Sequence, residues 1–172
     1  MQIHHLSENN SVLNHFLGQI RDVNIHNDSL RFRKNMERIG EIMAYEISKN
    51  LDYQAVAIPT PLGTKATHYI KNPLVICSIL RAGLTLHNGF LNYFDAAENG
   101  FISAYRHHPN NDDFFEIIVQ YQAVADINNK TVVVVDPMLA TGQSIVAVFK
   151  RLMERGTPSE IHIAVVIAAP EG

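Results

Sequence analysis

The sequence has little cysteine: Cys77 is the single one among its 172 residues. One cysteine excludes an internal disulfide framework and a cysteine-based zinc module, because both need several thiols. Cys77 lies inside the apolar string LVICSIL. We therefore expect it to be a small buried hydrophobic residue.

Long hydrophobic runs are also lacking. The longest, residues 132–135 and 163–169, are much shorter than the ~18 residues that a membrane-spanning helix needs. The first residues, MQIHHLSENNS, contain no basic stretch followed by an apolar one, so we expect no signal peptide. These absences predict a protein without membrane association, in a reducing, cytoplasmic compartment.

Neither sign of charge dominates the chain. Lys and Arg number 14 and Asp and Glu 17, a net charge of −3, and no long basic stripe argues for nucleic-acid binding. A hydrophobic content of 47% excludes a disordered chain. The length fits one domain. We expect residues 1–172 to form it, with a helical region over about residues 1–50 and a core over about residues 54–172.

Alternating patterns along the chain predict the α/β class. Apolar residues recur every three or four positions over residues 30–51, which indicates an amphipathic helix capped by Asp28 or Ser29. The composition of residues 59–71 predicts a loop. Short apolar runs predict strands at residues 54–58, 74–80, 101–105, 114–120, 131–135 and 161–168, and helical patterns cover residues 85–94 and 144–155. Strands that alternate with helices predict a mostly parallel central sheet flanked by helices.

The strongest local signal follows the strand predicted to end at Val135. Asp136 ends this strand, and a short loop leads to a helix that begins near Ser144. Ligands of open α/β sheets bind outside the carboxyl ends of the strands. The small or hydroxylic residues of the loop let backbone N–H groups approach an anion, and the helix N-terminus favours negative charge. The pattern predicts a phosphate-binding loop, although an ordinary strand-to-helix connection is the alternative. It matches neither a P-loop nor a dinucleotide-binding fingerprint.

Two arginines follow two other predicted strands. Arg81 comes after residues 74–80, and Arg106 comes after residues 101–105. The carboxyl ends of parallel strands meet at one edge of a sheet, so we expect both arginines near Asp136. Guanidinium groups stay charged and bind phosphates in a bidentate manner. Each arginine alone could be a surface residue, but together with the Asp136 loop they predict a polyphosphate site with one carboxylate.

These residues carry a resemblance to a known family. ILRAG, AYR after a strand, VDPMLATG followed by Ser144, and AAPEG resemble the uracil phosphoribosyltransferases, as does the N-terminal RDVNI…LRFRKNMERIGEIMAYE. The match covers nearly the whole chain in order. It implies the type I phosphoribosyltransferase fold and an enzyme of pyrimidine salvage. The implied reaction transfers the phosphoribosyl group of 5-phosphoribosyl 1-diphosphate (PRPP) to uracil, giving UMP and diphosphate.

The resemblance also implies roles for particular residues. Asp136, Arg81 and Arg106 would be catalytic, with Asp136 on the ribose and both arginines on the diphosphate. The implied PRPP-binding residues are Arg81, Arg106, Asp136, Pro137, Met138, Leu139, Ala140, Thr141, Gly142, Gln143 and Ser144. Pro137 stands where other phosphoribosyltransferases carry a second acid. We therefore expect no metal ligands from the protein, with Mg²⁺ entering on the diphosphate.

Further implications concern assembly and regulation. The family resemblance and the apolar residues of the N-terminal helix predict a homo-oligomer. The basic residues of the same helix are most simply a solvated face, but in some family members a comparable region binds GTP as an effector. They are Arg31, Arg33, Lys34 and Arg38.

The sequence departs from the family pattern at two places. Residues 120–123 differ from the family's usual segment, and family members continue past AAPEG with a hood that recognises the base. Because the sequence stops at Gly172, we expect the hood to be absent from this chain, whether as part of a longer protein, a truncated chain or a natural variant. Two alternative functions stay open: a PRPP- or nucleotide-sensing regulator that binds RNA, and an inactive fragment without base recognition.

Overall fold

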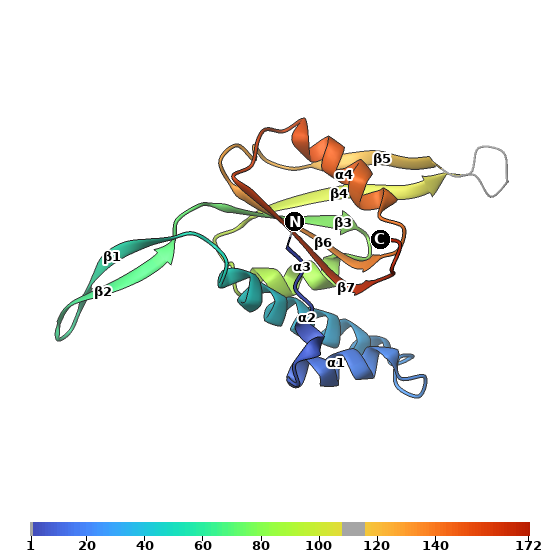
Figure 1. Ribbon diagram of the computed structural model, residues 1–172, viewed down its shortest axis with the longest axis horizontal. Coiled ribbons are helices and arrows are strands. Elements are labelled where there is room, and N and C mark those ends of the chain that lie inside the picture. Colours follow the sequence, from blue (N-terminus) through green and yellow to red (C-terminus); the bar gives the residue numbers. More distant parts are fainter. Residues whose placement is uncertain (1, 108–115) are drawn as a thin grey trace.

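The computed structural model describes residues 2–107 and 116–172, and a five-stranded sheet forms its centre (Figure 1). The strand order is β5-β4-β3-β6-β7. Only the β4–β5 pair is antiparallel among these described strands, so the predicted mostly parallel α/β sheet is confirmed. The strands are β3 (Leu74–Leu80), β4 (Glu98–His107), β5 (Glu116–Ala123), β6 (Thr131–Leu139) and β7 (Glu160–Ala168).

The central strands β3 and β6 are buried because helices cover both faces of the sheet. Residues 74–79 and 131–135 are buried without interruption, which explains their nearly continuous apolar sequence. The prediction for β3 is correct to the residue. The prediction for β6 is too short, because pairing with β7 continues through Asp136 to Leu139. Asp136 therefore lies within the strand rather than after it.

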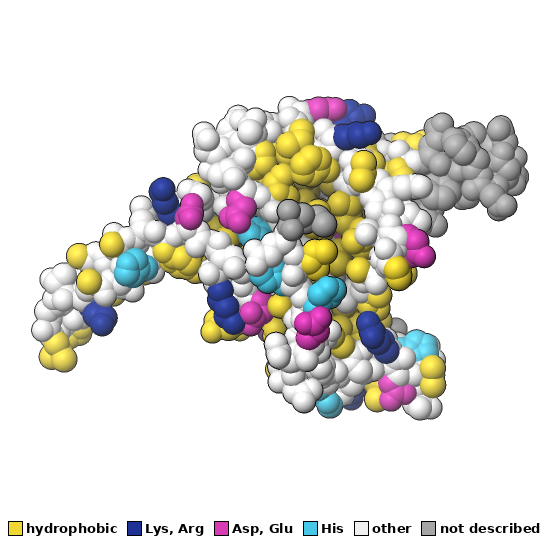
Figure 2. Space-filling view, in the orientation of Figure 1, with side chains coloured by type: hydrophobic (Ala, Val, Ile, Leu, Met, Phe, Trp, Pro, Cys, Tyr) yellow, Lys and Arg dark blue, Asp and Glu magenta, His cyan; other side chains and the backbone are white. Residues whose placement is uncertain are grey.

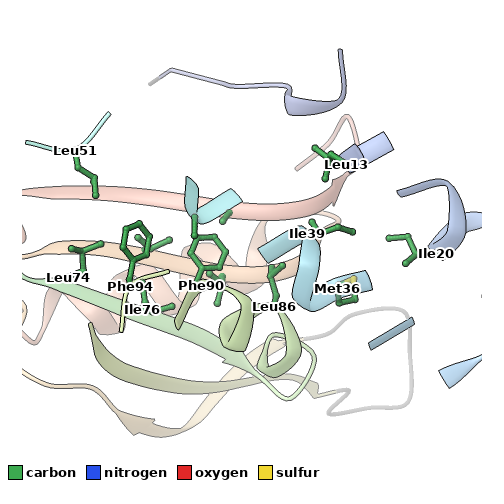
Figure 3. Packing of buried hydrophobic residues seen from close by; sticks show 14 residues of the cluster. Leu13, Ile20, Met36, Ile39, Leu51, Leu74, Ile76, Leu86, Phe90 and Phe94 are labelled. Carbon is green, nitrogen blue, oxygen red and sulfur yellow. The ribbon is translucent and has the colours of Figure 1, made fainter. Parts of the chain in front are cut away.

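Helices form a layer on each face of the sheet (Figure 1). On one face, α3 (Leu84–Leu91) lies against the sheet and α2 (Ser29–Ser48) packs on α3, with η1 (Leu6–Glu8) and α1 (Val12–Arg21) beyond. On the other face lies α4 (Gln143–Met153). Figure 3 shows Leu86 and Phe90 of α3 and Ile76 of β3 in the core cluster between this helix and the sheet. The predicted cap of α2 is confirmed, since the Asp28 carboxylate accepts a hydrogen bond from the Arg31 backbone N–H at 3.0 Å.

The helices α2 and α3 contact each other backbone to backbone at two glycines. A Cβ atom at Gly89 would lie 2.1 Å from the Glu37 carbonyl oxygen, and one at Gly40 would lie 2.5 Å from the Leu86 carbonyl oxygen. Neither position has room for a side chain. This contact holds α3, and with it the connection from β3, at a short distance from the N-terminal helices.

A separate hairpin projects from the body of the protein (Figure 2). It consists of β1 (Tyr53–Thr60) and β2 (Gly63–Ile70), paired from Tyr53↔Ile70 to Thr60↔Gly63. The loop prediction for residues 59–71 is wrong, and the strand predicted at residues 54–58 lies outside the central sheet. No buried face imposes an apolar alternation on this ribbon, so the periodicity that marks core strands is missing from β2.

No helix in the described part of the chain is long and apolar enough to cross a bilayer.

Candidate functional site

A small cavity opens where β6 ends and α4 begins, at the carboxyl edge of the sheet. Its volume is about 160 Å³. It is lined by Asp136, Met138, Leu139, Ala140, Thr141, Gly142, Ser144 and Ile145. We call this cavity the cradle. It brings together most of the residues that the sequence predicted as a phosphate-binding loop.

Gly142 shapes the mouth of the cradle. Its backbone has φ 73° and ψ −13°, in the left-handed region that glycine adopts without strain, and it occupies the N-cap position of α4. Because glycine carries no side-chain acceptor, the helix has no side-chain cap, and the first backbone N–H groups of α4 stay available to another acceptor. Together with the positive end of the helix dipole, these donors make the cradle suited to an anion.

Among the described residues that line the cradle, Asp136 is the one with a carboxylate. Its side chain is half-buried at the end of β6. Burial raises the pKa of Asp136 above its ordinary value, and a long 3.5 Å hydrogen bond from the Met138 backbone N–H acts in the opposite direction. A desolvated carboxylate beside a set of backbone donors can bind hydroxyl groups of a ligand whose phosphate lies in the cradle.

Arg81 lies on the loop that joins β3 to α3, next to the strand that carries Asp136. Arg81 is exposed, and the Leu80–Arg81 peptide bond is cis. Gly83 donates its N–H to the Ile79 carbonyl at 3.0 Å. A Cβ atom at Gly83 would lie 2.9 Å from the Val135 carbonyl oxygen. The Arg81 loop, residues 80–83, therefore packs directly against β6 just before Asp136.

Arg106 lies farther along the edge than predicted. It belongs to β4 and pairs with Ile117 of β5, rather than following the strand as expected. Leu80 is level with Ser103, so the Arg106 backbone lies three residues, roughly 10 Å, beyond the start of the Arg81 loop. Its side chain lies outside the described part of the chain. The structure thus places the backbone of the Arg81 loop beside the part of β6 that leads into Asp136, and the Arg106 backbone lies farther along the strand direction.

Besides Arg81 and Arg106, two residues of the predicted segment 136–144 do not line the cradle. Pro137 is absent from its wall, and Gln143 lines a wider groove of about 540 Å³ between β5 and α4. Thr141 borders both the groove and the cradle. Beside the groove, Gln122 donates from Nε2 to the Arg151 carbonyl at 3.1 Å, so the divergent segment 120–123 ties β5 to α4.

The turn after β7 forms part of the same edge. Ala169 donates its N–H to the Leu139 carbonyl at 2.8 Å, and Gly172 donates to Ala169 at 3.0 Å. A Cβ atom at Gly142 would lie 3.9 Å from Gly172 Cα. The AAPEG string therefore borders the cradle, a contact that the strand pattern alone did not predict.

Most of the basic residues of α2 contact neighbouring side chains of α2, its N-cap or α1. Arg31 lies 3.5 Å from Asp28 and Lys34 lies 2.7 Å from Glu37. The Arg38 guanidinium donates to Asn35 at 3.2 Å and lies 5.2 Å from the centre of the Phe16 ring. These contacts agree with the simpler interpretation, in which the basic residues form a solvated face of the helix.

The fold and the site together are those of the phosphoribosyltransferase class. The sheet is mostly parallel, the cradle lies at the end of the central strand β6, and the Arg81 loop follows the neighbouring strand β3. The structure is similar to that of the AQ2163 protein from Aquifex aeolicus, with a TM-score of 0.84, 28% identity, and coverage of 95% of this chain and 76% of that chain. A hypoxanthine phosphoribosyltransferase from Staphylococcus aureus shares the fold, with a TM-score of 0.56, 16% identity, and coverage of 80% and 65%.

Sequence comparison narrows the class to one family. A model of the uracil phosphoribosyltransferase family matches residues 7–172. A uracil phosphoribosyltransferase from Porphyromonas gingivalis is 47% identical over 171 residues, which are 99% of this chain and 79% of that protein. One from Pyrococcus furiosus is 34% identical over 168 residues, 96% of this chain and 70% of that protein. The chain belongs to the uracil phosphoribosyltransferase family.

Proposed function

We propose that the protein is an enzyme that transfers the phosphoribosyl group of PRPP to uracil, giving UMP and diphosphate. The observation that carries this proposal is the cradle, which combines the Asp136 carboxylate with an uncapped helix start and follows the stretch of β6 against which the Arg81 loop packs. Membership of the uracil phosphoribosyltransferase family indicates PRPP and uracil as the substrates. The two ends of PRPP both carry phosphate, which matches an anion cradle at the end of β6 and a loop that carries an arginine after the neighbouring strand β3.

The cradle is assigned to the 5-phosphate of PRPP. The backbone N–H groups at the start of α4 would donate to the phosphate oxygens, and Gly142 lets the backbone approach closely. Asp136, at the base of the cradle, would accept hydrogen bonds from the ribose hydroxyls. Fixing the phosphate and the ribose at once places the anomeric carbon at a defined position, and such positioning is one way in which a site accelerates a two-substrate reaction.

Arg81 is assigned to the diphosphate. When the bond from the anomeric carbon to the diphosphate breaks, negative charge grows on the leaving group and positive charge grows on the ribose ring. Arg81 would stabilise the first, and the carboxylate of Asp136 would favour the second. We assign Arg106 to the diphosphate as well, on the strength of the family resemblance.

The donor set of the site fits a magnesium ion that arrives with its substrate. In residues 2–107 and 116–172 no three His, Cys, Asp or Glu side chains gather in a way that could hold a metal. Mg²⁺ is commonly bound through one or two carboxylates together with substrate phosphates and water. With Asp136 assigned to the ribose, the ion would be held by the diphosphate and water, and it would supply positive charge at the leaving group.

The direct test is the formation of UMP by the full-length protein. With uracil, PRPP and Mg²⁺, UMP and diphosphate should appear in equal amounts, and neither should form when uracil is replaced by cytosine. PRPP binding measured by calorimetry, without any UMP formation, would contradict the proposal and favour an inactive or regulatory protein. Retention of RNA on a filter would identify the regulator.

Asp136→Asn is expected to lower the rate of UMP formation and to raise the thermal stability of the protein at pH 7. The amide keeps the shape but loses the charge, so UMP formation should fall by about a hundredfold or more. Because the pKa of Asp136 is raised in the folded protein, ionisation of the wild-type carboxyl costs stability once the pH exceeds its ordinary value of 3.8. The variant should therefore have the higher Tm at pH 7, and this advantage should shrink as the pH falls toward 3.

Thermal unfolding from pH 3 to pH 8 measures this effect. Asp126→Asn is the matched control, because Asp126 lies in an exposed turn on the connection from β5 to β6. The control should keep full activity. A Tm difference at Asp136 that is constant with pH, or largest at low pH, would contradict the assignment of a desolvated carboxylate.

We also propose that the enzyme is a homo-oligomer and that its β1–β2 hairpin contributes to the interface. An isolated two-stranded hairpin is marginally stable, yet this one exposes both faces, with Leu62 fully exposed and Tyr69 53% exposed. Apolar side chains on such a ribbon gain stability when a second copy covers them. The family resemblance further leads us to propose a cytoplasmic location and GTP as an effector. Adding GTP to the assay of UMP formation tests the effector.

Shortening the hairpin is expected to lower the oligomeric state. Replacing residues 56–67 by a Gly-Asn turn keeps the Tyr53↔Ile70 pair and removes most of the exposed ribbon. Light scattering after gel filtration should show a smaller species than the wild type at equal concentration. Leu30→Ser, on the exposed face of α2, tests the N-terminal helix separately. An unchanged mass after shortening would exclude the hairpin from the interface.

A further inference from the structure

Two buried polar atoms lie beneath the Arg81 loop. Ser78 is 0% exposed and His87 is 2% exposed. Within the described part of the chain, neither the Ser78 hydroxyl nor His87 Nδ1 has a hydrogen-bond partner. A buried polar atom without a partner costs free energy, so two such atoms in one region call for a physical explanation.

Both residues lie in the same narrow space, between α3 and the sheet. The His87 ring stacks on Phe101, with 4.9 Å between the ring centres, and Phe101 pairs with Ser78 across the β3–β4 ladder. One helical turn before His87, a Cβ atom at Gly83 would lie 2.5 Å from the Ser78 hydroxyl oxygen. Side chains on a helix lean toward its N-terminus, so His87 leans toward Gly83 and Ser78.

The two atoms are chemically complementary. His87 Nε2 lies 2.7 Å from the Asn99 side-chain oxygen, which can only accept, so Nε2 carries the proton. Burial lowers the pKa of His87 and favours the neutral ring. In that neutral ring Nδ1 is an acceptor, and the Ser78 hydroxyl is a donor.

We infer that Ser78, His87 and Asn99 form a buried polar seam that positions Arg81 for PRPP. In this seam one buried water accepts from the Ser78 hydroxyl and donates to His87 Nδ1, while His87 Nε2 donates to the Asn99 side-chain oxygen. The seam fixes the first turn of α3 against β3 and β4. Since Gly83 begins that turn and also contacts the Val135 carbonyl, the seam sets the position of the Arg81 loop relative to Asp136. The role of Arg81 itself rests on the proposed function.

The kinetic test compares Ser78→Ala with Cys77→Ala. Each variant removes one heavy atom from a buried residue of β3, but Cys77 faces α4 and Ser78 faces α3. Ser78→Ala should raise the KM for PRPP about fivefold, with kcat and the KM for uracil nearly unchanged, because it loosens a loop that binds the diphosphate. Cys77→Ala should lower the Tm and leave the KM for PRPP unchanged. Equal KM values for PRPP in the two variants would overturn the inference.

A spectroscopic test reads the hydrogen bonds of the wild-type protein and needs no enzyme activity. In ¹⁵N spectra of histidine-labelled protein, His87, assigned with the His87→Gln variant, should carry its proton on Nε2 across neutral pH. The Nδ1 resonance should show an accepted hydrogen bond. A proton on Nδ1 would overturn the seam. If the wild type shows the seam but forms no UMP, the proposed function fails and the seam stands.

Discussion

Replacing Arg81 by alanine is expected to lower kcat/KM for PRPP by about a hundred- to a thousandfold. This is the magnitude observed when one preorganised donor to developing charge is removed. The variant loses the guanidinium of the loop that packs against β6, while the exposed position of Arg81 leaves the core untouched. Initial rates of UMP formation at varied PRPP, together with the Tm, measure both effects.

Arg81→Lys and Arg155→Ala are the controls for this prediction. Lysine keeps the charge but cannot bind two phosphate oxygens with a planar fork, so its rate should lie between those of the wild type and the alanine variant. Arg155 is exposed after the C-terminal end of α4, away from the carboxyl edge of the sheet, and its replacement should leave the rate unchanged. A normal rate for Arg81→Ala would remove Arg81 from the site.

Replacing Gly89 by alanine is expected to destabilise the protein by about 3 kcal/mol, at the upper end of the usual cost of overpacking. The new methyl group would meet the Glu37 carbonyl 2.1 Å away and the Glu41 backbone nitrogen 2.9 Å away, and neither can move without separating α2 from α3. For a protein of this size the Tm should fall by roughly 6 to 12 °C.

Gly18→Ala is the matched control. Gly18 also lies inside a helix, but a Cβ atom there would meet nothing within 4 Å. Alanine should raise the Tm slightly, because it favours the helix over glycine by roughly 0.5 to 1 kcal/mol. If both alanine variants moved the Tm in the same direction, the backbone contact between α2 and α3 would not be the cause.

The central sheet could be predicted because burial imposes a pattern on its strands. β3 and β6 are covered on both faces, so they read as continuous apolar runs bounded by polar or turn-forming residues. The hairpin is exposed on both faces and carries no such pattern, which is why β2 was predicted as a loop. The end of β6 was misplaced because Asp136 and Pro137 look like a strand end, whereas pairing with β7 keeps the backbone extended to Leu139.

The cradle could be predicted because its residues are consecutive. Its supports could not, since they come from separate segments that only the fold brings together. The contact of Gly83 with Ser78 and Val135 depends on how β3, α3 and β6 pack. The pairing of His87 with Asn99 likewise joins α3 to β4. The sequence signals that exist, a serine in an apolar strand and a histidine on an apolar helix face, are shared by many buried positions without any role in a site.

The projecting hairpin also gives the protein an internal reporter of its assembly. Backbone amides of a ribbon with solvent on both faces open by local fluctuation, at a small fraction of the free energy of global unfolding. In the separated chain the amides of residues 53–70 should therefore exchange with deuterium much faster than those of β3 or β6. Contact with a second copy would slow the exchange of the ribbon selectively, so its protection would follow association independently of catalysis at the cradle.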